Sequence, residues 1–475
     1  MRKHHIYLLI LTIVLQVNDI ISQNEPFFKD ESIFLTALSF GNVSHFSAGQ
    51  AAFMCVETVS ENQIIIAYRD WENQGYGTVV MGSVNDLETT YSVPVVFAEG
   101  NVYLPKIKMI NDSVFLIVYR DMDLAGQGML VKGVLNNGNI QFELPIVFSN
   151  SMISTSSLIM MTDTTFLIAY KDNSNGFGTL LPGKFVNGSV VLGELQIFNA
   201  ATSFENVLCR LTDTTFVITY RDAGNGEMGT AKIGVLQNEQ VSFSDPVIFS
   251  TAATTEVAVA GINTTDFVIS YQSGGEKGES IIGKLLGNSV VFASPLIYSG
   301  IAVSGNAVVS LSDSIAVVSF TDVGNNNYGT SILMHINNDA LSYGDAVVYI
   351  EGGAFTTQGS VLSDSTFVLV FRNERNDFSG SSVCGKITTD QTIGIKYNTE
   401  THDIALYPNP TRGFVTVEGL GIDNIEVVNM NGQVVKTIRP SGNKTQVDLS
   451  DLKKGVYLVR AIFENNSVIR KIVLK

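Results

Sequence analysis

The sequence predicts an all-β protein in which a seven-bladed β-propeller of four-stranded blades precedes a small C-terminal β-sandwich. Three observations favour this fold class. A motif recurs about every fifty residues, short apolar runs alternate with turn residues, and no part of the repeats shows the periodicity of an amphipathic helix. The 475 residues divide into an expected leader at 1–22, a propeller at 30–398 and a terminal domain at 403–475.

The repeat is clearest in an apolar segment that often ends in a basic and an acidic residue. The strong copies are FLIVYRD at 115–121, FLIAYKD at 166–172, FVITYRD at 216–222, FVISYQS at 267–273 and FVLVFRN at 367–373, with weaker copies at 64–70 and 316–322. The aromatic residue at the fifth position is Tyr68, Tyr119, Tyr170, Tyr220, Tyr271, Phe320 and Phe371. Their spacing of 49 to 51 residues is typical of arrays in which one repeat forms one propeller blade.

One period, residues 207–249, contains four β-rich runs separated by turn residues. The second run, FVITYRD, is the most continuously apolar, which predicts an interior strand covered on both faces. The last run contains a proline at matching positions, namely Pro94, Pro145, Pro246 and Pro295. Because proline cannot donate to a strand ladder, this run is expected at the outer edge, from which the chain crosses to the next blade.

A second aromatic column lies 22 residues before the first. It consists of Phe46, Phe97, Phe148, Phe198, Phe249, Tyr298 and Tyr349. The rings either pack between neighbouring blades or form a ladder on which a ligand stacks. Phe46 precedes the first complete repeat, which predicts that the N-terminal segment adds an outer strand to the seventh blade, 355–388, and closes the ring. Residues 391–396 are the alternative for that position.

Composition disfavours several functions. Lys and Arg number 29 against 45 Asp and Glu, so the formal net charge is −16, and such a field repels nucleic acid and anionic membrane surfaces. Residues 23–402 are strongly acidic, with 17 basic and 37 acidic residues, whereas 403–475 are slightly basic, with ten and seven. The chain has only 5 histidines and none of the G-x-S-x-G, HExxH or phosphate-loop motifs, which disfavours the corresponding catalytic chemistries.

The N-terminus has the pattern of a secretory signal peptide at 1–22. Arg2 and Lys3 precede the apolar run 7–17, which is too short to span a bilayer, and a single N-terminal anchor is the alternative. No other segment is long and apolar enough to span a bilayer, so we expect no transmembrane segment in the mature chain.

The three cysteines, Cys55, Cys209 and Cys384, each lie in a strand-like run. This placement predicts buried free thiols, and a bridge between Cys55 and Cys384 is the alternative if the chain ends meet.

The C-terminal domain contains several specific motifs. It starts with Tyr407-Pro408-Asn409-Pro410-Thr411-Arg412-Gly413 and continues through IEVVNMNGQVV at 425–435 and VDLSDLKKGVYLVR at 447–460. Alternating strands, the Asn431-Gly432 turn, and Gly455 ahead of the strand that contains Tyr457 predict a small antiparallel β-sandwich.

This segment closely resembles the type A C-terminal sorting domain of the type IX (Por) secretion system of Bacteroidota. The resemblance implies that the type IX secretion machinery is a partner and carries the protein across the outer membrane. It further implies that the domain is removed, and that the product is either released or attached at the cell surface.

The candidate ligand site lies in loops expected at one face of the propeller. The second strand ends in Arg69-Asp70, Arg120-Asp121, Lys171-Asp172 and Arg221-Asp222 in four of the repeats. Repeated Asp, Asn and carbonyl oxygens suit sugar hydroxyls or Ca²⁺, the one cofactor that the sequence suggests. In the alternative interpretation these side chains satisfy the backbone of tight turns, and the basic residues pair with neighbouring blades.

Trp71 is the only tryptophan and directly follows the first of these pairs, with Tyr76 five residues further. A loop tryptophan is either a platform on which a sugar ring stacks or a cap over the edge of a blade.

These patterns favour a secreted or cell-surface binding protein whose propeller recognises a glycan or another surface ligand. The near equivalence of the loops favours binding, because enzymes usually concentrate their chemistry in one irregular site. The alternatives are a polysaccharide-acting enzyme with paired carboxylates, either a glycoside hydrolase or a lyase, and a structural or adhesion protein without a small ligand.

Overall fold

The computed structural model describes residues 35–136, 138–390, 404–430, 432–463 and 467–475. The chain divides into two compact units, one of which is Thr36–Asp390, and the other contains the C-terminal domain. The expected signal peptide and the alternative closing segment at 391–396 lie outside the described residues.

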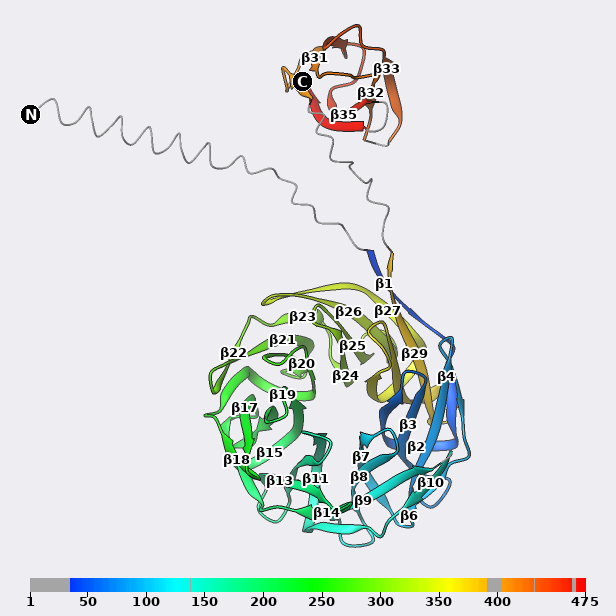
Figure 1. The fold of residues 1–475 in the computed structure, drawn as a ribbon, viewed down its shortest axis with the longest axis vertical. Coiled ribbons are helices and arrows are strands. Elements are labelled where there is room, and N and C mark those ends of the chain that lie inside the picture. The colour runs from blue at the N-terminus through cyan, green and yellow to red at the C-terminus, as the bar shows by residue number, and fades with distance from the viewer. Residues whose placement is uncertain (1–34, 137, 391–403, 431, 464–466) are drawn as a thin grey trace, which may run out of the picture. The chain divides into compact units, whose positions relative to one another are not determined.

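The unit Thr36–Asp390 is a propeller-like ring of antiparallel sheets (Figure 1). Four kinds of strand succeed one another along the chain: inner, second, third and outer. The inner strands are β2 (Ser44–Ser60), β7 (Val102–Asn111), β11 (Ile146–Met160), β15 (Gln196–Arg210), β19 (Val247–Gly261), β24 (Val303–Ser312) and β27 (Ala340–Val361). The second strands are β3 (Gln63–Asp70), β8 (Val114–Asp121), β12 (Thr165–Asp172), β16 (Thr215–Asp222), β20 (Asp266–Ser273), β25 (Ile315–Asp322) and β28 (Thr366–Asn373).

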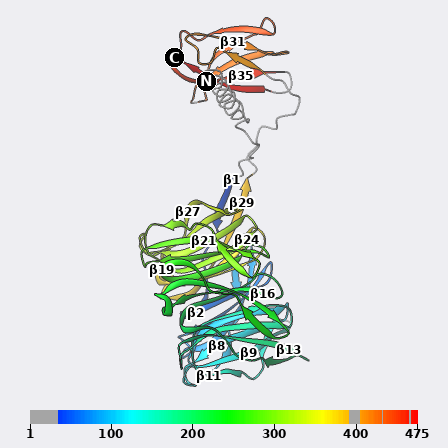
Figure 2. The same cartoon turned by 90° about the vertical axis from the view of Figure 1, so that its left-hand side faces the viewer.

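The remaining strands lie further from the centre. The third strands are β4 (Tyr76–Asn85), β9 (Gln127–Asn136), β13 (Phe177–Val186), β17 (Met228–Gln237), β21 (Lys277–Leu286), β26 (Tyr328–Asn337) and β29 (Ser379–Asp390). Short outer strands are β1 (Leu35–Phe40), β5 (Glu88–Tyr91), β6 (Val95–Ala98), β10 (Asn139–Phe142), β14 (Ser189–Leu192), β18 (Gln240–Phe243), β22 (Ser289–Phe292) and β23 (Leu296–Ser299). Two 3-10 turns, η1 (Ala223–Asn225) and η2 (Glu374–Asn376), lie in loops. Seen edge-on, the strands run from one face of the ring to the other (Figure 2).

The second strands are interior, as the apolar runs predict. In β16 the side chains from Phe216 to Tyr220 are all buried, and the strand pairs with β15 on one side and β17 on the other. A strand that is paired on both edges and covered on both faces has no solvent-facing position, which explains why these runs do not alternate between apolar and polar residues.

The outer edge differs from the single outer run that the sequence suggested. Around Pro246 the run breaks: β18 pairs with one part of β17, and the start of β19 pairs with another part. Since proline has no N–H for the ladder, pairing stops at this residue. Beyond it, β19 continues without interruption across to the next sheet and becomes the inner strand there, paired with β20.

The two aromatic columns form pairs between neighbouring sheets. Phe198 on β15, where that strand pairs with β13, packs against Tyr220 on β16 with ring centroids 5.3 Å apart. The equivalent pairs have centroids 5.1 to 5.4 Å apart and are Phe46–Tyr68, Phe97–Tyr119, Phe148–Tyr170, Phe249–Tyr271, Tyr298–Phe320 and Tyr349–Phe371. Packing therefore accounts for the second aromatic column.

Gly178 on β13 makes room for one of these rings. A Cβ atom at this position would lie 2.5 Å from the edge of the Phe198 ring. Such a distance is well inside van der Waals contact, so the aromatic column depends on a glycine in the third strand.

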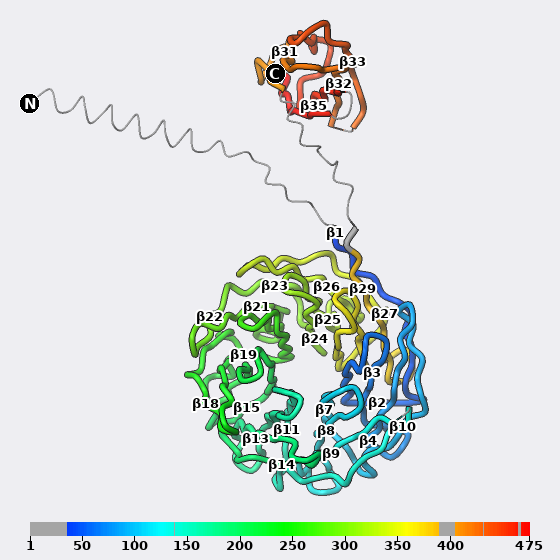
Figure 3. The backbone as a smooth tube through the Cα atoms, in the orientation of Figure 1, coloured from blue at the N-terminus to red at the C-terminus, as the bar shows by residue number. Residues whose placement is uncertain are grey.

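The N-terminal segment closes the ring, as Phe46 predicted. The first part of β2 pairs with β29, and β1 also pairs with β29. Figure 3 shows this junction, where the start of the described chain lies beside β29. Pairing the first strands with the last sheet leaves no open edge at that point.

The C-terminal domain is a small antiparallel sandwich, as expected. One sheet contains β30 (Ala405–Tyr407), β31 (Phe414–Glu418) and β34 (Lys444–Asp448), and the other contains β32 (Asn424–Val428), β33 (Val434–Ile438), β35 (Gly455–Ile462) and β36 (Ser467–Leu474). Alternate residues of both sheets, such as Val415, Val427 and Val459, form one apolar core.

Candidate functional site

The inner strands enclose a cavity of about 1080 Å³ at the centre of the ring. Each inner strand contains a β-bulge near one end of this cavity. In β15 the register moves from Phe204, opposite Arg221, to Val207, opposite Thr219, so Glu205 and Asn206 occupy the space of one residue. The bulge residues therefore lie at the end of the sheets where the second strands finish and the predicted loops begin.

The first residue of every bulge has a left-handed backbone with φ between 48° and 59°. We call these the mouth residues, and they are Phe53, Leu104, Thr155, Glu205, Glu256, Gly305 and Thr356. Residues other than glycine rarely adopt this conformation. Its recurrence in every inner strand indicates that the packing of the ring stabilises the strained bulges.

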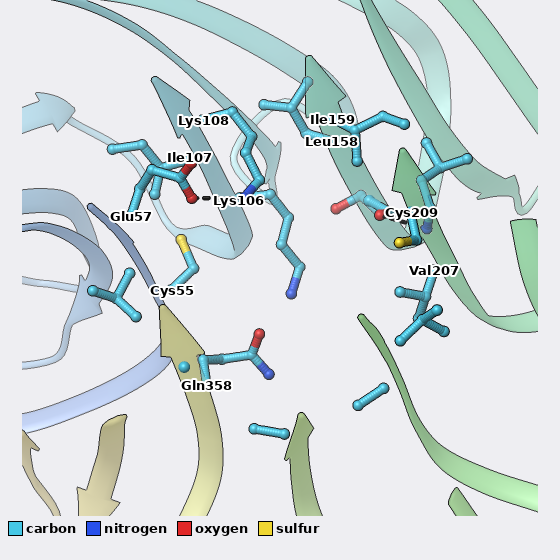
Figure 4. Close-up of a pocket in the computed structure, with 18 of the residues that line it drawn as sticks. Cys55, Glu57, Lys106, Ile107, Lys108, Leu158, Ile159, Val207, Cys209 and Gln358 are labelled. Carbon is cyan, nitrogen blue, oxygen red and sulfur yellow. Dashed lines mark hydrogen bonds and ion pairs between the residues drawn. The ribbon is translucent and has the colours of Figure 1, made fainter. Parts of the chain in front are cut away.

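Two residues further along each inner strand lies a second layer of the cavity wall. We call these the middle residues, and they are Cys55, Lys106, Ser157, Val207, Ala258, Ala307 and Gln358. Lys106 and Gln358 extend into the cavity from β7 and β27 (Figure 4). Burial lowers the pKa of the Lys106 amine, and the nearby Cys55 and Glu205 offset part of this effect.

Deeper in the cavity lie an ion pair and the Cys209 thiol, two residues beyond the middle residues. Lys108 donates to the Glu57 carboxylate at 2.6 Å, and this pair raises the pKa of Lys108 although burial opposes the shift. Figure 4 shows the Cys55 side chain beside this pair and the Cys209 side chain on the other side of the space, next to Val207. Burial raises the pKa of Cys55 to about 11 and that of Cys209 to about 12, so both thiols are protonated at neutral pH.

Two carboxylates lie at the mouth on neighbouring strands. Burial raises the pKa of Glu205, and the charge of Glu256 adds to the rise. Burial also raises the pKa of Glu256, although its carboxylate accepts a hydrogen bond from the Gly305 N–H at 2.8 Å. Carboxyl groups with raised pKa values are candidate proton donors and acceptors for sugar hydroxyls.

The predicted basic residues stack on aromatic rings beside the mouth. The Arg69 guanidinium carbon lies 3.6 Å from the Trp71 ring centroid and 4.2 Å from that of Tyr103. The Arg120 guanidinium carbon lies 4.8 Å from the centroid of the same Tyr103 ring. Tyr103 in turn packs on the mouth residue Phe53, with centroids 4.9 Å apart. A continuous surface of rings and one guanidinium thus joins Phe53 to Trp71, which is 46% exposed.

A second stack of the same kind involves Lys171, Phe204 and Arg221. Lys171 and Arg221 lie 4.2 Å and 4.5 Å from the centroid of the Phe204 ring. Since Phe204 and Arg221 belong to one sheet and Lys171 to the preceding one, the stack joins neighbouring sheets.

The predicted acidic residues are bound within their own loops. Asp70 accepts from the Glu72 N–H, Asp121 from Asp123 and Leu124, Asp172 from Ser174, and Asp222 from Gly224. These are Asx turns, which favour the turn interpretation of this column.

Among the described residues no cluster of three His, Cys, Asp or Glu side chains is arranged to hold a metal ion. Tyr76 begins β4 and is half-buried.

Sequence reasoning missed the mouth and middle residues. Glu205 and Glu256 occupy the same column, 15 residues before the aromatic residues Tyr220 and Tyr271. That equivalence was available from the repeat spacing, whereas the direction of their side chains was not, because the bulge reverses the alternation of the strand.

The residues of the predicted sorting motif join the start of the C-terminal domain to its last strand. Asn409 donates to the Lys471 carbonyl at 2.7 Å and accepts from the Val473 N–H at 3.0 Å. Gly413 donates to Thr411, Tyr407 bonds to Glu418, and Tyr457 donates to the Lys453 carbonyl at 2.7 Å. Pro408 and Pro410 flank Asn409, Gly432 has φ 79°, and Gly455 begins β35.

Family comparison identifies this domain. Residues 405–475 match the family described as the secretion system C-terminal sorting domain. They are a sorting domain of the type IX (Por) system. The sorting domain implies interaction with the type IX machinery and secretion to the cell surface. The described chain has no helix of the length and hydropathy that crossing a membrane requires.

Structural comparison supports an all-β, propeller-like ring, and no curated protein matches the chain. A polysaccharide lyase, an ulvan lyase bound to GlcA(1-4)Rha3S, superposes with a TM-score of 0.50 at 7% identity, over 72% of this chain and 94% of that one. A protein from Dyadobacter fermentans has a TM-score of 0.46 at 12% identity over 74% and 99% of the chains. A leech intramolecular trans-sialidase has a TM-score of 0.42 at 9% identity over 73% and 70%.

Proposed function

We propose that the protein is a secreted, surface-delivered glycan-binding protein whose ring is a seven-bladed β-propeller at about 30–398. The second strand and its aromatic pair occur seven times among the described residues, which supports the blade number. Glycans bind at the mouth of the central cavity, and the residues for this role are Phe53, Trp71, Tyr103, Glu205 and Glu256.

The observation that carries this proposal is the surface that joins Trp71 to the cavity. Sugar rings bind proteins through stacking of their C–H faces on aromatic rings and through hydrogen bonds from hydroxyl groups. Trp71, Tyr103 and Phe53 supply the aromatic part, and Glu205 and Glu256 supply acceptors on the other side of the mouth.

Glycan-array screening, followed by titration of any hit, tests the proposal. Trp71 is the only tryptophan, so its fluorescence reports binding at this surface directly. Trp71→Ala, measured by calorimetry because it lacks the fluorophore, is expected to weaken binding about two- to twelve-fold, because an aromatic contact contributes about 0.5–1.5 kcal/mol. Val93→Ala, at a side chain 82% exposed on the outer edge, is the control and should bind as the wild type does. An array without hits contradicts glycan binding.

Delivery is tested separately. Removal of residues 405–475 is expected to abolish surface display, as measured by protease accessibility on whole cells, while the ring still folds. The released and the surface-attached product differ in whether the protein is found in the culture medium or in the outer-membrane fraction.

A second candidate function, polysaccharide cleavage, is favoured by the carboxyl pair at the mouth. Burial raises the pKa of both Glu205 and Glu256, and the two carboxyls lie on neighbouring inner strands, which is the kind of pair that acid–base cleavage of a glycosidic bond uses. Screening for new reducing ends or unsaturated products tests this candidate. Activity that survives both Glu205→Gln and Glu256→Gln rules out the pair as its source.

A further inference from the structure

Lys106 is the only charged residue among the middle residues of the cavity. In the described part of the chain its amine forms neither an ion pair nor a hydrogen bond, although the neighbouring Lys108 pairs with Glu57. A half-buried ammonium without an anionic partner is costly, because burial removes hydration that nothing in the protein replaces. The cavity thus contains one cationic group that no carboxylate of the described ring contacts directly, since Glu205 acts on it only electrostatically.

The surroundings of Lys106 favour an anionic group attached to an organic ligand. Across the cavity the middle residues Val207, Ala258 and Ala307 are small and apolar. On the near side Gln358 uses one amide N–H to donate to the Thr357 carbonyl at 2.9 Å, which leaves its second N–H for another acceptor. Figure 4 shows both Lys106 and Gln358 extending into the same space.

We propose that Lys106 binds the carboxylate of an acidic sugar at the end of a glycan chain. The inference rests on the proposed glycan-binding function and adds the class of the terminal sugar. Lys106 lies two residues, or about 7 Å, below the mouth residue Leu104, so one terminal sugar spans the distance from the mouth to the amine. Gln358 donates a second hydrogen bond, and the apolar side of the sugar faces Val207, Ala258 and Ala307.

The charge of the ring limits the ligand to few anionic groups. Residues 23–402 hold 17 basic and 37 acidic residues, and a field of this sign repels polyanions. A glycan with one terminal carboxylate is repelled only weakly and can reach the single cation, Lys106. A heavily charged polysaccharide is repelled strongly by the acidic ring.

Calorimetric titration with methyl β-D-glucuronide and methyl β-D-glucoside tests the proposal, because these probes differ in the carboxylate. The wild type is expected to prefer the glucuronide by about ten-fold or more. The charge-assisted hydrogen bond from Lys106 to the carboxylate is stronger than a hydrogen bond to the neutral hydroxymethyl group of the glucoside. Lys106→Met should abolish the preference and Lys106→Arg should retain part of it. Lys386→Met, at an exposed lysine of β29, is the control with the same change in charge and should keep the full preference.

A second measurement covers the case in which Lys106→Met fails to fold. Acetylation of the wild-type protein is followed by peptide mass spectrometry, and the glucuronide, but not the glucoside, should protect Lys106 from modification. Equal binding of both probes, or no binding of the glucuronide, overturns the carboxylate site. The broader glycan-binding function is judged by the array, where hits confined to neutral glycans would preserve that function and exclude this inference.

Discussion

The Glu256 carboxylate accepts a hydrogen bond from the Gly305 N–H at 2.8 Å and so joins the bulges of two neighbouring inner strands. The Glu205 carboxylate in the same way interacts with the backbone N–H of Val257 on β19, which offsets part of the rise in its pKa. These two mouth residues therefore join neighbouring inner strands as well as lining the cavity. Because both residues are half-buried when they do this, ionisation of their carboxylates has a cost in stability.

Glu205→Gln is expected to stabilise the protein at neutral pH. The pKa of Glu205 is raised in the folded state, so the folded protein binds the proton more tightly than the unfolded chain. Stability therefore falls as pH rises from the ordinary glutamate pKa of about 4.3 to the raised value, and the full cost is present above it.

Chemical unfolding at several pH values measures this effect. The variant should unfold at higher denaturant concentration than the wild type at pH 7, and the difference should vanish below about pH 4. Glu61→Gln, at an exposed side chain, is the control and should change stability little at either pH. A difference that grows toward acid pH would contradict the sign of the shift.

Phe198→Ala is expected to destabilise the ring strongly. Phe198 is 1% exposed and packs against Tyr220 between two sheets, and the loss of such a ring typically costs about 3–5 kcal/mol. Equilibrium denaturation measures the loss, and Leu144→Ala, at a side chain 89% exposed, should cost less than about 0.5 kcal/mol. A loss at Phe198 as small as the one at Leu144 would show that the column does not carry the packing between sheets.

The repeat made most of the ring predictable, because packing constraints recur in every copy. The spacing of Tyr220 and its equivalents predicted the second strands, and Phe46 predicted that the N-terminal segment joins the last sheet. The split outer strand was not predicted, since the sequence does not show that pairing stops at Pro246 while the extended chain continues.

The candidate site was less predictable than the fold. The loop pairs such as Arg221-Asp222 repeat because they form turns and stacks, and these are structural roles. Lys106, in contrast, does not repeat: its equivalents are neutral, so no column marks it. A single lysine in a strand becomes a candidate only when a bulge and the closure of the ring place it in a cavity.

Arg69→Ala is expected to change the environment of Trp71. The guanidinium covers one face of the indole at 3.6 Å, so its loss exposes a second face to water. The emission maximum of the single tryptophan should move to longer wavelength, and acrylamide should quench it more strongly. Arg120→Ala removes a guanidinium that stacks on Tyr103 rather than on Trp71 and should leave the spectrum unchanged. Unchanged quenching in Arg69→Ala would show that the stack does not persist in solution.

The three thiols are expected to react slowly with Ellman's reagent in the folded protein. Cys55, Cys209 and Cys384 are free and buried, and burial raises the pKa of each above its ordinary value. Since the thiolate is the reacting species, less than about one per cent of Cys55 is reactive at pH 8 even where the reagent reaches it. In denaturant without reductant, all three thiols should react rapidly. Release of a single equivalent under those conditions would reveal a disulfide between two of them, and rapid reaction of the folded protein would show that the inner strands open readily.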